Sequence, residues 1–132
     1  MRRSAASYAE FHEQVLFAKR CDLHPAVRRH VYTATMTGVN LGVRAATQAK
    51  AKGVKKGVPD WMLYAHGRST AGEWICHGLA LEFKSPTGKG KLKPEQIGWA
   101  TGLRLEGWRV EHPRTAREAW EILCHYLGIS DQ

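Results

Sequence analysis

Three short stretches of the chain show the apolar patterning that is typical of β-strands. Residues 61–65 (Trp-Met-Leu-Tyr-Ala) form a short apolar run, residues 79–84 alternate strictly, and residues 108–112 alternate again. The two sides of the second stretch are Leu79, Leu81 and Phe83 on one face and Ala80, Glu82 and Lys84 on the other. The pattern predicts three strands, and we expect the Leu79 face to enter the core.

Four other stretches are predicted to be helical: residues 7–21, 44–52, 94–106 and 115–127. Ser7 and Thr115 are placed to cap the first and the last of them. Pro94 suits the first turn of the third helix, and Gly128 ends the fourth. These positions predict where the helices begin and end.

The order of the elements predicts the fold class. Residues 26–37 are ambiguous between a loop and a short strand, residues 66–72 are a predicted polar loop, and residues 85–93 are a lysine-rich loop. The order helix, irregular segment, two strands, helix, strand, helix indicates an α/β domain with a small mixed β-sheet flanked by helices. We expect one domain over residues 1–132, with residues 1–6 as a flexible tail.

The charge of the chain favours a polyanionic partner. Its 132 residues include 20 Lys and Arg against 12 Asp and Glu, a net charge of +8. An anionic membrane is the rival to nucleic acid, but no basic amphipathic helix with a broad apolar face is evident. No apolar run approaches the roughly 18 residues of a membrane span, and no apolar signal core follows the basic N-terminus. We therefore expect a cytoplasmic protein, or a nuclear one in a cell with a nucleus.

The cysteines do not suggest a disulfide framework or a zinc site. Cys21, Cys76 and Cys124 are few and scattered, although each has a histidine nearby. A structural zinc site needs four ligands in paired close spacings. Buried thiols are the favoured interpretation.

The acidic residues at the predicted strands carry the candidate chemistry. Glu82 and Lys84 are two residues apart on one strand, so they share a face. If the first two strands pair antiparallel, Asp60 at the start of the first lies beside Glu82 near the end of the second. Two adjacent carboxylates repel unless a proton or a cation intervenes, and Mg²⁺ prefers carboxylate oxygens. A strand with an outward Glu and Lys, or an Asp after a Pro, is also an ordinary structural feature.

A metal ion at this position would favour phosphodiester hydrolysis. Such an ion polarises a phosphoryl oxygen and lowers the pKa of a bound water. Lys84 would offset developing negative charge or orient the attacking water. The nearby Lys89, Lys91 and Lys93 would hold flanking phosphates.

Three motifs resemble those of one nuclease family. Gly57-Val58-Pro59-Asp60, Leu81-Glu82-Phe83-Lys84 and Gln96 are similar to the motifs of the VRR-NUC domain, a branch of the PD-(D/E)XK nuclease superfamily. That domain occurs as stand-alone proteins in phages and bacteria and as the C-terminal domain of the Fanconi-associated nuclease of eukaryotes. The resemblance runs from about Glu10 to Leu127, and it implies a core like that of restriction endonucleases.

The resemblance also implies roles for individual residues. Asp60 and Glu82 would bind Mg²⁺ or Mn²⁺, with the Phe83 carbonyl as a further ligand. Lys84 would be the catalytic lysine, and Gln96 the glutamine on the following helix. Gln96 shares a helical face with Ala100 and Leu103, although simple polarity at a helix start also explains it.

The family has a glutamate on the first helix, for which Glu10 and Glu13 are the candidates. Glu10 is favoured as a catalytic or metal-binding residue because Gln14 follows four residues later, as in the family pattern. The alternative is a capping box from Ser7 to Glu10, in which Glu10 would bond only to the helix start. Asn40, Arg44, Lys55 and Lys56 precede or flank the Gly57–Asp60 turn and are expected to contact DNA.

These features predict a metal-dependent DNA endonuclease, structure-specific for branched, flapped or four-way-junction DNA and acting in replication, repair or recombination. The resemblance also implies a homodimer, because stand-alone members of the family are similar to dimeric junction resolvases, with Trp74, Ile75 or the final helix supplying apolar contacts. The alternative is a non-catalytic nucleic-acid-binding module that stacks bases on Trp61, Trp74 or Trp99. A basic accessory protein that binds other proteins is a third possibility.

Overall fold

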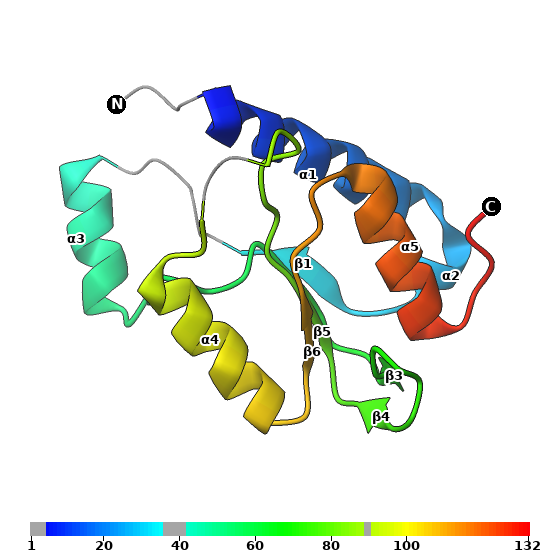
Figure 1. Ribbon diagram of the computed structural model, residues 1–132. Helices are drawn as coiled ribbons and strands as arrows, with labels where there is room; N and C mark the ends of the chain where they lie inside the picture. Colours follow the sequence, from blue (N-terminus) through cyan, green and yellow to red (C-terminus); the bar gives the residue numbers. More distant parts are fainter. Residues whose placement is uncertain (1–4, 36–41, 89–90) are drawn as a thin grey trace.

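The computed structural model describes residues 5–35, 42–88 and 91–132 (Figure 1). The helices are α1 (Ala5–Leu23), α2 (Pro25–Arg28), α3 (Val43–Ala51), α4 (Pro94–Leu105) and α5 (Ala116–Leu127). The strands are β1 (Tyr32–Ala34), β2 (Trp61–Leu63), β3 (Gly67–Arg68), β4 (Ile75–Cys76), β5 (Leu79–Leu81) and β6 (Arg109–Glu111).

Four of the strands form a mixed sheet in the order β1-β2-β5-β6. β2 pairs antiparallel with both β1 and β5, whereas β5 and β6 are parallel. The predicted α/β class with a small mixed sheet is confirmed. β3 and β4 pair separately, between β2 and β5 in the chain. The prediction of a loop throughout residues 66–72 is therefore wrong at Gly67 and Arg68, because their pairing with β4 is not encoded in the local sequence.

Helices cover both faces of the sheet (Figure 1). α1 and α5 pack on one face, where the larger hydrophobic cluster lies, and α4 covers the other. The large side chains of the first cluster include Phe17, Trp61, Leu81, Trp120 and Tyr126. The second cluster consists of Met62, Ala80, Ala100 and Val110. The sheet is therefore the middle layer of three.

The two faces of β5 and the residues after it separate as their alternation predicts. Leu79, Leu81 and Phe83 belong to the larger cluster. The opposite face is not exposed to solvent either: α4 packs on Ala80 and bonds to Glu82 through Gln96, and Glu82 is 3% and Lys84 9% exposed. The interpretation of Glu82 and Lys84 as ordinary surface residues of a strand is therefore wrong.

The predicted helix boundaries agree with the structure at α5 but not at α1. The Thr115 hydroxyl accepts from the Glu118 N–H at 3.0 Å, and Gly128 ends α5 with a left-handed φ of 69°. By contrast, α1 begins at Ala5, so Ser7 lies inside the helix and cannot be its cap. The alternative of a capping box from Ser7 to Glu10 is therefore wrong. Residues 5 and 6, predicted to lie in a flexible tail, belong to α1.

β5 is shorter than predicted, yet the backbone beyond it stays in register with its neighbour. β5 ends at Leu81. The N–H groups of Glu82 and Lys84 still donate to the carbonyls of Glu111 and Pro113, at 3.0 and 2.9 Å. These bonds hold residues 82–84 straight where the candidate site begins.

The three cysteines are buried free thiols, as expected from their spacing. Cys21 and Cys124 lie in the larger hydrophobic cluster together with Cys76. Burial raises the pKa of the Cys21 thiol to about 12, so it remains protonated at neutral pH.

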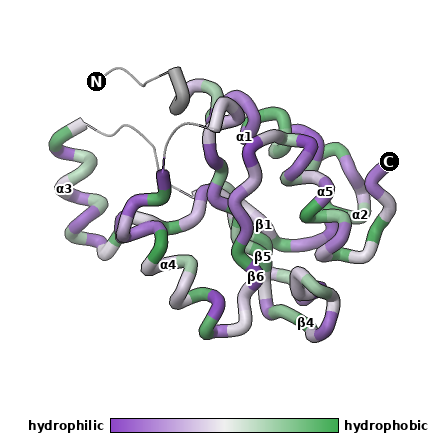
Figure 2. The backbone as a smooth tube through the Cα atoms, viewed as in Figure 1, coloured by the Kyte–Doolittle hydropathy of each residue, from purple (hydrophilic) through white to green (hydrophobic). Residues whose placement is uncertain are grey.

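Within the described residues, no helix is both long and apolar enough to cross a membrane. α4 and α5 have only 12 residues each, and hydrophilic residues recur along the 19-residue α1 (Figure 2).

Candidate active site

Asp60 and Glu82 are brought together by the pairing of β2 with β5. Trp61 lies opposite Leu81, so the register places Asp60 beside Glu82. The Phe83 N–H donates to Asp60 Oδ2 at 2.8 Å, and the Asp60 N–H donates to Glu82 Oε2 at 3.1 Å. The predicted proximity of the two carboxylates is confirmed, and each is fixed by the backbone beside the other.

The two carboxylates share an environment that favours a proton between them. Burial, followed by the charge of Asp60, raises the pKa of Glu82 to about 9. Burial also raises the pKa of Asp60, while a hydrogen bond from the Glu82 side chain acts in the opposite direction. Glu82 is therefore protonated at neutral pH, with its carboxyl beside that of Asp60. A cation that replaced this proton would relieve the same repulsion.

Gln96 reaches this pair from the first turn of α4. Its Nε2 donates to Glu82 Oε1, and its Oε1 accepts from the Lys93 N–H at 2.8 Å. The Gln96 side chain thus forms hydrogen bonds to the start of α4 and to the buried Glu82 carboxyl at the same time. The inward placement predicted from the helical face it shares with Ala100 agrees with this geometry.

Lys84 lies on the same face as Glu82, two residues farther along the chain. Its side chain is 9% exposed. Its charge lowers the pKa values of three acids, Asp60, Glu82 and Glu10, in each case against a larger effect of burial. Lys84 is therefore the cation at the centre of the acidic cluster.

The two glutamates of α1 have different surroundings. Burial raises the pKa of Glu10, the charge of Asp60 adds to this, and Lys84 and the Ser85 backbone N–H oppose it. Glu13 instead accepts from the Ala116 N–H at 2.8 Å, at the first turn of α5. The structure places Glu10 beside the Asp60–Lys84 cluster and Glu13 at a helix start.

Two residues that the sequence pattern did not assign hold Asp60 in place. The Asp60 carbonyl accepts from Gln14 Nε2 at 3.3 Å and from the Thr35 N–H at 2.9 Å. The Thr35 hydroxyl donates to the Pro59 carbonyl at 2.6 Å. Gln14 could have been found from its place one helical turn after Glu10. Thr35 has no comparable signal, because only the pairing of β1 with β2 brings it there.

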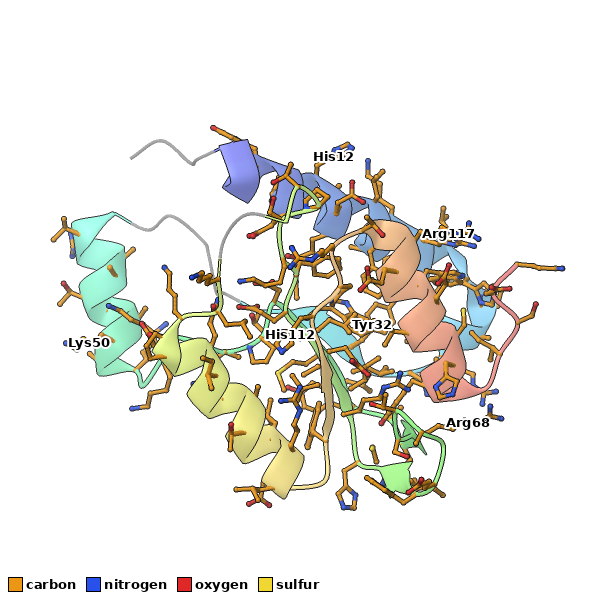
Figure 3. The ribbon with its side chains drawn as sticks, viewed as in Figure 1. His12, Tyr32, Lys50, Arg68, His112 and Arg117 are labelled. Atoms are coloured by element: carbon orange, nitrogen blue, oxygen red, sulfur yellow. The ribbon has the colours of Figure 1, made fainter. Side chains whose placement is uncertain are left out.

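His112 is a further neighbour that the sequence did not single out. β5 and β6 are parallel with Leu81 opposite Glu111, so His112 follows beside Glu82. Figure 3 shows His112 between α4 and the sheet. Its Nδ1 is buried without a hydrogen-bond partner among the described residues. Burial, then the charges of Arg104 and Lys84, lowers its pKa, so His112 is neutral at physiological pH.

Most of the residues predicted to contact DNA are described, and these lie at the surface. Lys91, Lys93, Arg44, Lys55 and Lys56 are all exposed. Lys89 and Asn40 lie outside the described residues. Among the tryptophans proposed to stack on bases, Trp61 is 1% exposed and belongs to the core, so that assignment is wrong, whereas Trp74 is 61% exposed.

The donor set of the cluster suits a hard divalent cation. Within residues 5–35, 42–88 and 91–132, no three His, Cys, Asp or Glu side chains form a complete cage for a metal ion. Mg²⁺ does not require one, because it keeps several waters and binds through one or two carboxylates. Asp60 and Glu82 meet that requirement, and neither cysteine nor histidine is needed.

Comparisons with known proteins identify a fold. No family model and no curated protein match the sequence. A solved structure described as a "VRR_NUC domain protein" superposes with a TM-score of 0.69 at 20% sequence identity, over 93% of this chain and 91% of that one. The resemblance noted in the motifs therefore extends to the tertiary structure, and the chain has the fold of a VRR-NUC domain.

Proposed function

We propose that this protein is a metal-dependent DNA endonuclease that hydrolyses phosphodiester bonds. The observation that carries the proposal is the pair of the partly buried Asp60 and the buried Glu82, hydrogen-bonded through the backbone and flanked by Lys84. Burying two acids at this point destabilises the fold unless a proton or a cation neutralises them. A perturbed, coupled pair of this kind is typical of functional sites.

The metal ion is proposed to be Mg²⁺ or Mn²⁺, held by Asp60 and Glu82. The Phe83 carbonyl is the candidate for a further ligand, and Glu10 is a candidate whose charge interacts with Asp60 and Lys84. When bound, the ion would polarise the scissile phosphate and lower the pKa of a coordinated water.

The protein's own residues supply the remaining requirements for hydrolysis. Lys84 would hold its ammonium beside the scissile phosphate and stabilise negative charge as it develops. Gln96 would hold Glu82 in one rotamer through its amide. Glu10 would accept a proton, because burial raises its pKa and makes its carboxylate a stronger base than an exposed one.

DNA is the proposed substrate, with branched, flapped or four-way-junction forms as the preferred class. A net charge of +8 and the exposed lysines around the acidic cluster favour a polyanion. A homodimer would place two sites on opposing strands, and the exposed Trp74 and Ile75 are the proposed contact. Light scattering in solution tests the dimer, which a monomeric mass would rule out.

The nuclease proposal is tested with labelled linear, flapped and four-way-junction DNA in the presence of Mg²⁺, Mn²⁺ or EDTA. We expect cleavage with either metal and none with EDTA, because the carboxylate pair needs a cation to bind the substrate phosphate. Absence of cleavage on every substrate would favour the second candidate, a non-catalytic nucleic-acid-binding module. Such a module would bind DNA without cleaving it.

The two glutamates of α1 provide a matched pair of variants. Glu10→Ala is expected to lower kcat by roughly 10²-fold, the lower end of the range for a general acid or base, with little change in stability. Glu13→Ala removes the acceptor of the Ala116 N–H and should cost about 1 kcal/mol of stability while leaving kcat unchanged. Cleavage rates and urea unfolding check both. Equal losses of kcat would contradict the assignment.

A further inference from the structure

We propose that residues 42–58, which we call the basic arm, bind the phosphate backbone of duplex DNA next to the cleavage site, with α3 lying along a groove. This inference rests on the proposed nuclease function and names the form of DNA that the site receives.

The connection that contains the basic arm is far longer than the sheet requires. β1 and β2 are adjacent and antiparallel, with Ala34 opposite Trp61. Two residues are enough to join such strands, and hairpin connections rarely exceed about five. Here residues 35–60 intervene, including the helix α3. Long connections of this kind in compact domains are usually functional.

Both ends of this connection are fixed at the candidate site. Thr35 donates to the carbonyls of Pro59 and Asp60, which fixes the start of the connection against its end. Gly57 has a φ of 90°, and a Cβ there would approach the Glu95 backbone to 2.5 Å. The return segment therefore lies directly on the first turn of α4, beside Gln96. A molecule bound by the arm is held next to Asp60.

The charge of the arm is of one sign. The sequence contains no Asp or Glu between Asp22 and Asp60. The arm contributes five exposed cations: Arg44, Lys50, Lys52, Lys55 and Lys56. Without acidic neighbours to neutralise them, these side chains repel one another in the free protein, and a phosphate backbone relieves that repulsion.

α3 is not stabilised by packing of its own side chains into the core. It has nine residues, none of them buried. Figure 1 shows it set apart from the three layers of the domain. Isolated helices shorter than about 12 residues are marginal in water. A partner that packs along α3 would supply the missing stabilisation, so binding and helix formation are coupled.

The side chains of α3 fit duplex DNA better than a membrane or a protein groove. Arg44, Thr47 and Gln48 are three and four residues apart and share one face, and Lys50 adjoins it. Apart from Val43, the other residues of the helix are alanines, which offer too little apolar surface for a membrane or a hydrophobic groove. A helix is about 10–12 Å across with its side chains, close to the roughly 12 Å width of the major groove.

The test compares duplex binding by two variants that each lose three cations. The arm variant is Arg44→Ala/Lys50→Ala/Lys52→Ala, and the control is Lys19→Ala/Arg29→Ala/Arg117→Ala. All six side chains are exposed, and Lys50 and Arg117 lie at opposite sides of the molecule in Figure 3. Fluorescence anisotropy of labelled duplex and single-stranded DNA is recorded over a series of KCl concentrations, with Ca²⁺ in place of Mg²⁺.

We expect the arm variant to bind duplex DNA at least about 10-fold more weakly than the control at moderate salt. The slope of log K against log[KCl] should fall by about 0.9 for each phosphate that the variant no longer neutralises. Equal affinity and equal slope for the two variants would overturn the proposal. So would a loss confined to single-stranded DNA, because that result removes the duplex assignment.

A second variant tests the helix without changing charge. Ala46→Gly/Ala49→Gly weakens α3, since each glycine disfavours helix relative to alanine. We expect duplex affinity to fall several-fold, and the wild-type protein to gain helical circular dichroism on binding duplex. Unchanged affinity would overturn the role of the helix.

The outcomes separate this proposal from the nuclease proposal. If the wild-type protein cuts DNA and the arm variant binds like the control, the arm proposal fails and the nuclease proposal stands. If the wild-type protein cuts no DNA, and the arm variant loses duplex affinity while the control does not, the nuclease proposal fails and the arm proposal stands.

Discussion

Lys84→Ala is expected to lower the rate of DNA cleavage by roughly 10²- to 10³-fold in kcat, the loss typical of removing one group that stabilises the transition state. Lys84 is the cation among Asp60, Glu82 and Glu10, and its side chain is 9% exposed. No water can readily replace its charge in that position. The fall should appear in kcat and not in KM, because the charge it would stabilise develops only in the transition state.

Single-turnover cleavage at saturating protein measures this loss directly. Lys93→Ala is the matched control, since Lys93 is exposed nearby and should affect binding alone. Lys84→Ala also leaves the acidic pair without its cation, so the metal-free variant should be less stable than the wild-type protein at high pH. Cleavage by Lys84→Ala at the wild-type rate would remove Lys84 from the site.

Glu82→Gln is expected to abolish cleavage and, at alkaline pH, to stabilise the metal-free protein. The pKa of Glu82 in the folded protein is raised from 4.5 to about 9. A raised pKa means that the folded state holds the proton more tightly than the unfolded chain does. The resulting stability is complete below pH 4.5 and is lost as the pH rises towards 9. The glutamine has no ionisation, so its variant escapes that loss.

Calorimetric unfolding of both proteins between about pH 5 and about pH 9 tests this expectation. One pKa unit corresponds to about 1.4 kcal/mol, so the variant should unfold several degrees above the wild-type protein at the alkaline end. Mg²⁺ should then raise the Tm of the wild-type protein and leave that of the variant unchanged.

Glu121→Gln provides the control for these measurements, because it removes an exposed carboxylate on α5. It should change neither the pH dependence nor the effect of Mg²⁺. Equal responses to Mg²⁺ in Glu82→Gln and in the wild-type protein would show that Glu82 is not a ligand.

Local sequence patterns predicted much of the fold and the centre of the site. The alternation from Leu79 to Lys84 separated the core face from the functional face, because side chains on an extended backbone alternate whatever surrounds them. Thr115 and Gly128 marked the ends of α5 for similarly local reasons, a side-chain cap and a left-handed backbone conformation. The Asp60–Glu82 contact followed from strand pairing, which the register confirms.

Residues that depend on contacts between distant segments were not predictable in the same way. Thr35 reaches Asp60 only because β1 pairs with β2. His112 lies beside Glu82 only because β6 runs parallel to β5, a choice that no local pattern encodes. The burial of Glu82 depends on α4, whose Gln96 bonds to it on a face that the sequence alone left open to solvent.

The sequence by itself therefore determined which groups meet at the candidate site, namely two acids and a lysine at the start and the end of neighbouring strands. Only the tertiary structure decided how those groups behave. α4 and the sheet exclude water from Glu82, and the loss of hydration raises its pKa to about 9 and couples it to Asp60. The packing of α1 against α5 likewise separated the two glutamates, with Glu13 bonded to the start of α5 and Glu10 near the acidic pair. Periodicity is local, but desolvation depends on every segment that packs around a group.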